Sequence, residues 1–400
     1  MARYIGIRHR VKKTKEGESR PTMIAISEEG NVRALELATE TDELDFMLGS
    51  FPTGWRKAAE GEDLSHFLPR HRQELKERGA KEKNTRVSTG FDGLEPGDIV
   101  ATALGGSGDR LAYAMSRRSE EIGATVMRIP PFRLLALRGE QSKDDDHILL
   151  AGVAENHQEL CYVVGPRDRD LIAVSESYRA RRDAQRARIA CEQRLLQRAI
   201  GEIFLSQEGR YPEGEIEEVY NKMKASDEIL ANLEREEARR EAELKKAVAK
   251  LDVWNLILKQ VEGCGEVLAA GIITPIADIR RFATDAKLKA FAGVHVMRDG
   301  RFPRRRGGEV SNWSPQLRQA LYLLGTQFNY RAESVWGLKL REYKLKLRGK
   351  HPEVVTVNGK KRYTNGHIHK MATWRTITKF VEWLHREWSR VELAQAKVAE

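Results

Sequence analysis

The middle of the chain restricts the possible fold most, because its apolar residues recur every three or four positions from residue 177 to residue 258. This spacing is typical of a coiled-coil seam, and it passes through Ile216, Val219, Met223, Leu230, Leu233, Leu244, Ala247 and Leu251. A glycine- and proline-containing run at residues 209–214 breaks the pattern. We therefore expect two antiparallel helices of about 30 to 40 residues, each on the order of 50 Å long at 1.5 Å per residue. Ser226, Glu237 and Arg240 are expected to interrupt the seam. Such a hairpin is a spacer or a dimerisation arm, with a plain packing element as the alternative.

The residues before this hairpin show the alternation of strands and helices that is typical of an α/β domain. Strands are predicted at residues 4–7, 22–27, 32–37, 98–104 and 125–129, and a helix is predicted at residues 109–122. Gly30 and Asn31 favour a hairpin turn between two of the strands. The stretch at residues 56–86 is too charged for a core element. There we expect a surface helix or a flexible arm.

The residues after the hairpin are expected to be mostly helical and strongly basic. Between Arg298 and Lys350, thirteen Lys or Arg residues stand against four Asp or Glu residues, a net charge of +9, and aromatic residues are interleaved with them. Residues 355–363 are predicted to form a hairpin before a last helix at residues 368–396. The predicted domains are an α/β domain at residues 1–175, a helical hairpin at 176–252, a basic helical domain at 253–350, and a hairpin with the C-terminal helix at 351–400.

The overall charge favours a polyanionic partner. The chain of 400 residues carries 69 Lys or Arg and 59 Asp or Glu, a formal net charge of +10, although many ribosomal, chromatin and membrane-surface proteins share such a balance. Cys161, Cys191 and Cys264 lie far apart and form no C-x-x-C pair, so neither a disulfide framework nor a zinc knuckle is expected. No apolar run approaches the length that spans a bilayer. We expect a cytoplasmic protein without a membrane partner.

Two motifs in the basic region are candidate nucleic-acid contacts. The Gly263-Cys264-Gly265 turn matches a helix-hairpin-helix-like turn, in which glycines permit close backbone approach and the next helix offers free N–H groups to a phosphate. A tight interhelical turn without a ligand is the alternative. The second motif is an arginine cluster suited to bidentate phosphate contacts, and it comprises Arg301, Arg304, Arg305 and Arg306. A solvated charge run is the alternative reading of this cluster.

The remaining candidate contacts follow these motifs along the chain. They are Arg318, Arg331, His367, His369, Lys370 and Arg375. His367 and His369 are two positions apart at the start of a helix, so their side chains point apart, and no third ligand stands near them in the sequence. No metal site is expected there.

The order of several motifs in the second half resembles a known family. The motifs lie at residues 261–265, 279–282, 288, 291–294 and 317–322, with a glycine-arginine loop before the last of them. They are similar, in order and spacing, to the C-terminal domain of the bridge-RNA-guided insertion-sequence transposases with a DEDD-type RuvC-like domain. Those proteins also place a RuvC-like domain first and a coiled coil second. The resemblance implies an N-terminal RuvC/RNase H-like α/β domain in this chain.

The residues that carry the chemistry of that family differ here. The resemblance places Arg8 and Thr102 where the family has two metal-holding acids, and Asp299 where it has the recombinase serine. Magnesium-dependent cleavage needs several carboxylates around the cation, so we expect a degenerate RuvC-like domain that is not an enzyme. The alternative is an active nuclease that uses Mg²⁺, with acids drawn from Asp98, Asp109, Asp144, Asp145 and Asp146.

A coiled coil that leads into a helical RNA-binding domain is also the layout of the Nop domain of box C/D ribonucleoproteins. The combination looks like the Tas proteins of tandem interspaced guide RNA (TIGR) systems, and residues 366–372 with Trp374 and Arg375 are compatible with the C-terminal helix of that group. The resemblance implies an RNA-guided DNA-binding homodimer in a prokaryotic cell or encoded by a virus, with guide RNA and target DNA as partners. An active RNA-guided nuclease or transposase of the same superfamily and a structural ribonucleoprotein subunit are the alternatives.

Overall fold

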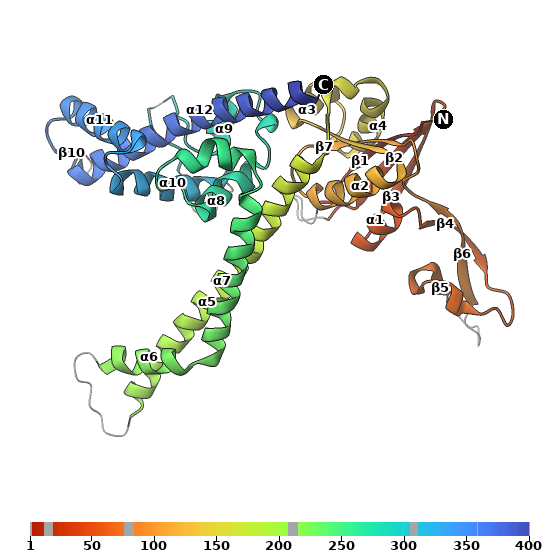
Figure 1. The fold of residues 1–400 in the computed structure, drawn as a ribbon, viewed down its shortest axis with the longest axis horizontal. Helices are drawn as coiled ribbons and strands as arrows, with labels where there is room; N and C mark the ends of the chain where they lie inside the picture. Colours follow the sequence, from red (N-terminus) through yellow and green to blue (C-terminus); the bar gives the residue numbers. More distant parts are fainter. Residues whose placement is uncertain are drawn as a thin grey trace. The chain divides into compact units, whose positions relative to one another are not determined.

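The chain forms two compact units, Met1–Arg169 and Asp170–Glu400 (Figure 1). The computed structural model describes residues 2–11, 19–75, 84–206, 215–298, 300–304, 311–357 and 359–399. The N-terminal unit contains a mixed sheet with helices, whereas the C-terminal unit is mostly helical. The prediction of an α/β part followed by a helical part is therefore confirmed.

A six-stranded mixed sheet forms the centre of the N-terminal unit, with the strand order β3-β2-β1-β7-β8-β9. Strand β1 is parallel to β7, and β7 is parallel to β8, whereas β2, β3 and β9 pair antiparallel to their neighbours. The strands are β1 (Tyr4–Arg8), β2 (Thr22–Glu28), β3 (Asn31–Leu37), β7 (Ile99–Ala103), β8 (Thr125–Ile129) and β9 (Tyr162–Val163). All five predicted strands are thus present. The β2–β3 hairpin is present too, but it turns at Glu29 and Gly30, which have φ values of 51° and 82°, one position before the predicted Gly30 and Asn31.

Helices cover both faces of this sheet because its strands are apolar on both faces. Ile5 and Ile7 pack in one core with Leu111 and Met115 of α2, whereas Leu150 of α4 belongs to the core on the other face. At Gly6 the helix α4 comes so close that a Cβ atom would lie 2.0 Å from the carbonyl oxygen of His147. The helices of this unit are α1 (Glu40–Met47), α2 (Asp109–Ile122), α3 (Pro131–Arg138) and α4 (Asp146–Asn156).

The charged stretch at residues 56–86 contributes residues 56–57, 72–75 and 84–86 to a second sheet, so the prediction of a surface helix is wrong for its described part. Residues 76–83 lie outside the described residues, so the prediction of a flexible arm is not tested there. Strands β4 (Phe51–Lys57), β5 (Arg72–Leu75) and β6 (Asn84–Asp92) pair antiparallel in the order β4-β6-β5. Most described side chains of these strands are not buried. Backbone pairing stabilises such a sheet while most of its side chains remain in contact with water, so a charged sequence is compatible with strands.

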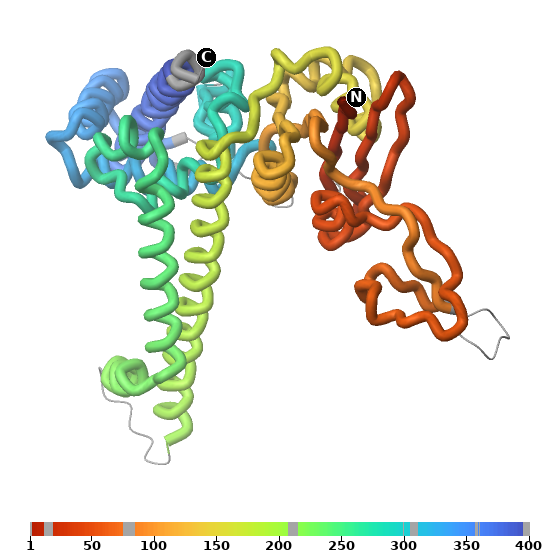
Figure 2. Tube along the Cα trace, turned by 45° about the vertical axis from the view of Figure 1, so that its right-hand side comes forward, coloured from red at the N-terminus to blue at the C-terminus, as the bar shows by residue number. Residues whose placement is uncertain are grey.

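The C-terminal unit begins with a pair of long helical arms that lie side by side (Figure 2). One arm is α5 (Pro166–Phe204), and the other consists of α6 (Glu215–Ser226) and α7 (Glu228–Val248). The second arm is therefore not the single helix that the sequence predicts, because the carboxylate of Asp227 accepts a hydrogen bond from the backbone N–H of Leu230 and starts a new helix. The predicted break at residues 209–214 lies outside the described residues.

Glu237 does not interrupt the packing of the two arms, contrary to the prediction. Its side chain is buried, and its carboxylate forms ion pairs with Arg181 at 3.0 Å and with Arg188 on the facing arm. The acid therefore joins the arms through paired charges instead of apolar contacts.

The rest of the C-terminal unit surrounds one apolar core. Trp388, Phe328 and Phe380 are fully buried in it. A π-helical turn (Val253–Ile257) and a 3-10 turn (Leu258–Gln260) lead into α8 (Glu266–Ile276), which is followed by α9 (Asp285–Phe291), α10 (Pro315–Tyr330), α11 (Val335–Lys350), the hairpin of β10 (Val355–Val357) and β11 (Lys360–Arg362), and α12 (Asn365–Ala399). The predicted hairpin and last helix are both present. Of the helices that the structure describes, none has the length and apolar composition needed to cross a membrane.

Candidate nucleic-acid interface

Asp98, the first candidate acid of the N-terminal unit, is held in a buried ion pair just before β7. Its carboxylate accepts hydrogen bonds from Nε and Nη2 of Arg3 at 2.9 and 2.7 Å, and another from the backbone N–H of Glu95 at 2.7 Å. Both partners of the ion pair are buried. The site therefore binds the strand ends together and leaves little of the carboxylate free for a ligand.

Three more of the candidate acids lie at the start of α4, near the opposite end of β1. Asp146 is paired with Arg138 through two hydrogen bonds of 2.6 and 2.7 Å, and Asp144 is paired with Arg20. Asp145 is exposed. Two of the three acids are therefore neutralised by arginine.

The two groups of acids do not converge. Tyr4 pairs with Ile99 and Ile7 pairs with Thr102, so Asp98 lies at the Tyr4 end of β1. Since Asp98 and Thr102 are four residues apart on one strand, about 13 Å separate them. Among the described residues, no group of three or more His, Cys, Asp or Glu side chains could hold a metal ion. These residues do not fit the converging carboxylates that Mg²⁺ requires.

Basic and neutral groups lie beside the α4 acids near the Arg8 end of β1. Thr102 donates its hydroxyl to the carbonyl oxygen of Ile7 at 3.2 Å, and Arg128 of β8 is paired with Asp109. Burial, together with the positive charge of Arg8, lowers the pKa of His147 at this end. The two positions that the family resemblance assigned to acids therefore hold a basic and a neutral side chain, and the nearby Asp144 and Asp146 are paired with arginines.

In the C-terminal unit, Arg318 at the start of α10 is enclosed by two tryptophans. Its guanidinium lies 4.6 Å from the ring centroid of Trp313 and 4.6 Å from that of Trp374, and its Nη1 donates to the carbonyl oxygen of Pro303 at 2.6 Å. Burial lowers the pKa of this guanidinium. Arg318 thus fixes the chain at residues 300–304 against α10 and α12.

The described part of the arginine cluster is presented on this support. Arg301 and Arg304 are exposed, and the ring of Phe302 between them lies 6.1 Å from that of Trp374. Arg305 and Arg306 lie outside the described residues, as does Asp299. Arg301 and Arg304 are therefore the members of the cluster that the structure places.

The start of α12 adds further basic and aromatic groups to the same region. Nδ1 of His367 accepts a hydrogen bond from the backbone N–H of Tyr363 at 2.9 Å, and the Tyr363 ring is stacked between the rings of His351 and His367, with centroid distances of 3.9 and 5.6 Å. Burial and then the charges of Arg362, Arg304 and other neighbours lower the pKa of His367. Lys370 is exposed on the next turn of the helix.

Two further predicted residues lie on the same helix. His369 is half-buried, and burial followed by the charges of Lys344 and Lys370 lowers its pKa. Arg375 is half-buried as well. We call the surface formed by Arg301, Phe302, Arg304, His367, Lys370 and Trp374 the arginine-loop surface.

Gly263, Gly265 and Arg331 lie elsewhere, at the other end of α10. Arg331 follows the last residue of α10 and is thirteen positions from Arg318, so about 20 Å of helix separates them. Gly263 has a φ of 86°, and a Cβ atom there would lie 2.8 Å from Cβ of Gln327. The predicted contacts therefore divide into two separate surfaces.

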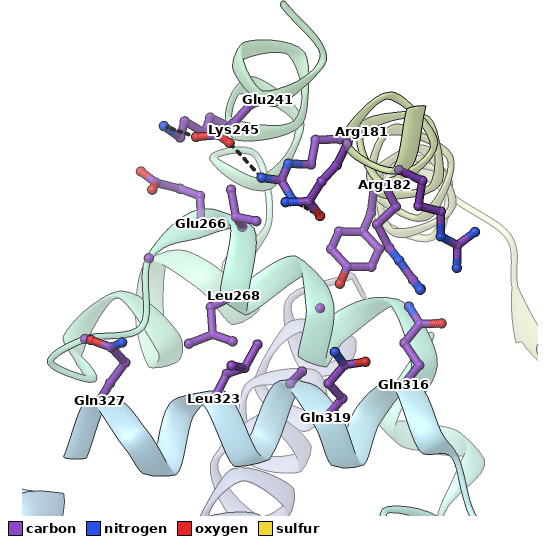
Figure 3. Close-up of a pocket in the computed structure, with 18 residues that line it drawn as sticks. Arg181, Arg182, Glu241, Lys245, Glu266, Leu268, Gln316, Gln319, Leu323 and Gln327 are labelled. Atoms are coloured by element: carbon purple, nitrogen blue, oxygen red, sulfur yellow. Dashed lines mark hydrogen bonds and ion pairs between the residues drawn. The ribbon is translucent and has the colours of Figure 1, made fainter. Parts of the chain in front are cut away.

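Sequence reasoning missed a pocket that adjoins this second surface (Figure 3). It has a volume of about 660 Å³ and is lined by α5, α7, α8 and α10, including Arg182 of α5 and Gln319 of α10. The only signal in the sequence is the spacing of Gln316, Gln319 and Gln327, which places them near one face of α10. Nothing in that spacing identifies the arm that faces them.

Comparison with known proteins identifies a relationship for a segment that includes Gly263, Gly265, Arg331 and the arginine cluster. The family model described as Transposase IS116/IS110/IS902 family matches residues 255–337, about a fifth of the chain. This segment covers α8, α9, α10 and the first residues of α11. The predicted relation to insertion-sequence transposases is confirmed for this part of the chain. A search of curated proteins found no match.

Proposed function

We propose that this protein is a transposase-related, RNA-guided DNA-binding protein that holds a short guide RNA on its C-terminal unit. The observation that carries the proposal is the arrangement around Arg318, which fixes an arginine-bearing segment on α10 within the transposase-related part of the chain. Exposed arginines on a fixed support contact phosphates with less loss of conformational freedom than arginines on a free loop. Base pairing between the guide RNA and the DNA would determine which DNA sequence is bound.

The arginine-loop surface has both kinds of group that bind RNA backbones and unpaired bases. Arg304 and Lys370 are exposed cations, and Phe302 and Trp374 present partly exposed rings beside them. Cations contribute salt-dependent affinity for phosphates, whereas aromatic rings stack on bases without strong sequence preference. A small acidic ligand would bind weakly here, because the surface is open and does not enclose it.

The proposed function also assigns a role to each domain of the chain. The C-terminal unit would be a Nop-like domain of the kind found in Tas proteins of TIGR systems, with domain limits at residues 175, 252 and 350. The helical arms would act as a coiled coil and as the contact between two copies of the chain. The mixed sheet with helices on both faces is compatible with a degenerate RuvC-like domain.

The arrangement of the acidic residues favours DNA binding without DNA cleavage. Asp98, Asp144 and Asp146 are engaged by arginines and lie at different ends of β1. An active nuclease would need these side chains to leave their partners and to gather around Mg²⁺. The proposed protein therefore binds DNA through its RNA and does not cut it.

The first test removes the arginine cluster. A variant with Arg304→Ala, Arg305→Ala and Arg306→Ala should lose co-purifying small RNA, and its RNA affinity should fall by about tenfold or more, with a salt dependence that is shallower by about two to three ions. A matched control replaces Arg239, Arg386 and Arg390, three exposed arginines outside the interface, by alanine. Normal RNA yield from the first variant would overturn the assigned role, as would equal losses in both variants.

The second test adds a DNA duplex that matches the RNA carried by the purified protein, with and without Mg²⁺. The expected result is specific retention of the duplex without cleavage. Cut or joined DNA would contradict the non-enzymatic version and support the nuclease or transposase alternative. Binding of RNA without any retention of DNA would support a structural ribonucleoprotein subunit instead.

A further inference from the structure

The pocket beside the helical arms is a partly open recess in the C-terminal unit. It lies between α5 and α7 on one side and α8 and α10 on the other (Figure 3). Its volume of about 660 Å³ is in the range of small-molecule sites, which spans about 300 to 1,000 Å³. Leu323 and Gln319 line it from α10, whereas Arg318 on the same helix faces Trp313 and Trp374. The recess therefore opens on a different face of α10 from the arginine-loop surface.

The wall formed by α5 and α7 has more positive than negative charge. Glu241 is shared by Arg181 at 3.2 Å and Lys245 at 2.9 Å, and Arg181 also pairs with Glu237 at 3.0 Å, so these four groups balance one another. The excess positive charge of this wall therefore comes from Arg182 and Arg186. Arg182 lies with its guanidinium 5.8 Å from the ring centroid of Tyr178. Within the described ranges, Arg182 has no acidic partner, which leaves its N–H donors available for an anion.

The opposite wall offers backbone donors at the start of α8. Gly265 precedes the helix, and no side chain caps it. The first N–H groups of an α-helix have no partner inside the helix, and residues 265–268 line the pocket. A Cβ atom at Gly265 would meet no other atom within 4 Å, so there is room beside these donors. Glu266 points away from α10 in Figure 3.

The wall formed by α10 has groups that suit a nucleobase. Gln316, Gln319 and Gln327 project from α10 toward α8, with Leu323 and Leu268 between them (Figure 3). A glutamine amide both donates and accepts hydrogen bonds, and it pairs with the N6 and N7 atoms of adenine. The leucines provide an apolar surface for the face of a base. Phosphate-binding and base-binding groups therefore lie on different walls of one recess.

We propose that this pocket holds one unpaired nucleotide of the bound RNA, with its phosphate near Arg182 and the start of α8 and its base against the glutamines of α10. The inference rests on the proposed function, because it concerns the same RNA at a second place on the protein. An unpaired nucleotide enters such a pocket at less cost than a paired one, since no base pair must be opened. The pocket would thus favour RNA stems that carry a bulge.

The test compares two RNA hairpins that differ only by one bulged adenosine. The full-length protein should bind the bulged hairpin about tenfold more tightly than the paired one, and 2-aminopurine at the bulge should change its fluorescence on binding. Arg182→Ala and Gln319→Leu should bring the affinity ratio close to one. Arg198→Ala, an exposed arginine of α5 outside the pocket, should keep the ratio of the unaltered protein.

The outcomes separate this inference from the function on which it rests. Equal affinity of the unaltered protein for both hairpins would overturn the pocket assignment and leave the proposed function standing. The pocket assignment would also be overturned, with the proposed function left standing, if Arg182→Ala and Gln319→Leu kept the full preference for the bulged hairpin. Binding of neither hairpin would overturn the proposed function and the pocket assignment together. Tighter binding of free adenosine monophosphate than of the bulged hairpin would show a free-nucleotide site and contradict the assignment.

Discussion

The two units use their arginines in different ways. In the N-terminal unit, Arg3 and Arg138 form close ion pairs with Asp98 and Asp146, and these pairs connect elements of the fold. In the C-terminal unit, Arg182 and Arg304 have no acidic partner in the part of the chain that the structure describes. A buried pair serves the fold, because removing one partner leaves an uncompensated charge. An exposed and unpaired arginine adds little to the fold and remains available to a polyanion. Asp98 and Asp146 are thus engaged in the fold, whereas Arg182 and Arg304 are among the basic residues left for a partner.

The largest effect is expected from Asp98→Ala, which leaves the buried guanidinium of Arg3 without its main partner. Breaking a buried ion pair in this way costs about 3 to 5 kcal/mol. Hydrogen exchange should show this loss in the amides of β1 and β7, because Arg3 and Asp98 precede these strands. The RNA affinity of the folded protein should stay the same.

The control for this variant is Asp145→Ala, since Asp145 is exposed on the same unit. It should change the stability of the sheet by less than about 0.5 kcal/mol. If Asp98→Ala were as stable as the control, the acids would not be structural, and the contrast between the two units would fail.

A smaller effect is expected from Arg318→Ala. The variant loses two cation–π contacts and a hydrogen bond to Pro303, so the C-terminal unit should lose about 2 kcal/mol of stability. RNA affinity should fall because residues 300–304 lose their support. Thermal unfolding and RNA titrations measure the two effects.

The variant Trp313→Leu tests whether Arg318 only supports residues 300–304 or contacts the RNA itself. It removes one wall around Arg318 and leaves the positive charge in place, so it should weaken RNA binding in the same direction as Arg318→Ala. Unchanged RNA affinity in Trp313→Leu, together with a strong loss in Arg318→Ala, would show that Arg318 contacts phosphate itself.

The smallest effect is a pH dependence at the start of α12. The pKa values of His367 and His369 lie below the usual 6.5, so the unfolded chain binds protons more readily than the folded one. Their contribution to stability is present above pH 6.5 and is lost as the pH falls from 6.5 through the lower pKa of the folded state. RNA affinity should change in the opposite direction, because protonated histidines add positive charge beside Arg304 and Lys370.

Titrations between pH 8 and pH 5 measure both trends. Replacing His367 and His369 by asparagine should flatten the stability profile and the affinity profile. If stability or RNA affinity depended on pH as steeply in this variant as in the unaltered protein, groups other than His367 and His369 would be responsible for the pH dependence.

Local patterns were sufficient to predict the regular elements of this fold. The strands near Ile5, Ile24 and Val126 and the helix that starts at Asp109 follow from periodicity that involves neighbouring residues only. The small sheet was missed because β4 is held by β6, whose residues lie more than thirty positions away on average, and its own charged sequence shows no apolar alternation. The separate helix after Asp227 was missed because a single capping side chain overrides an apolar repeat that continues on both sides.

The candidate sites depended more strongly on the tertiary structure. The sequence identified Arg318 as a cation in a basic region, but its role follows from Trp374, which is 56 positions away. Gly263 and Arg304 looked like parts of one site, and the length of α10 places them on separate surfaces.

The sequence by itself determined the order of an α/β part and a mostly helical part, the excess of positive charge in the second part, and the relation of residues 255–337 to transposases. Only the tertiary structure decided which acids are engaged, which arginines remain available, and that a recess lies between the arms and α10. The physical reason is the range of the interactions. Hydrophobic periodicity and capping act over a few residues, whereas the ion pair of Arg3 with Asp98 joins residues 95 positions apart.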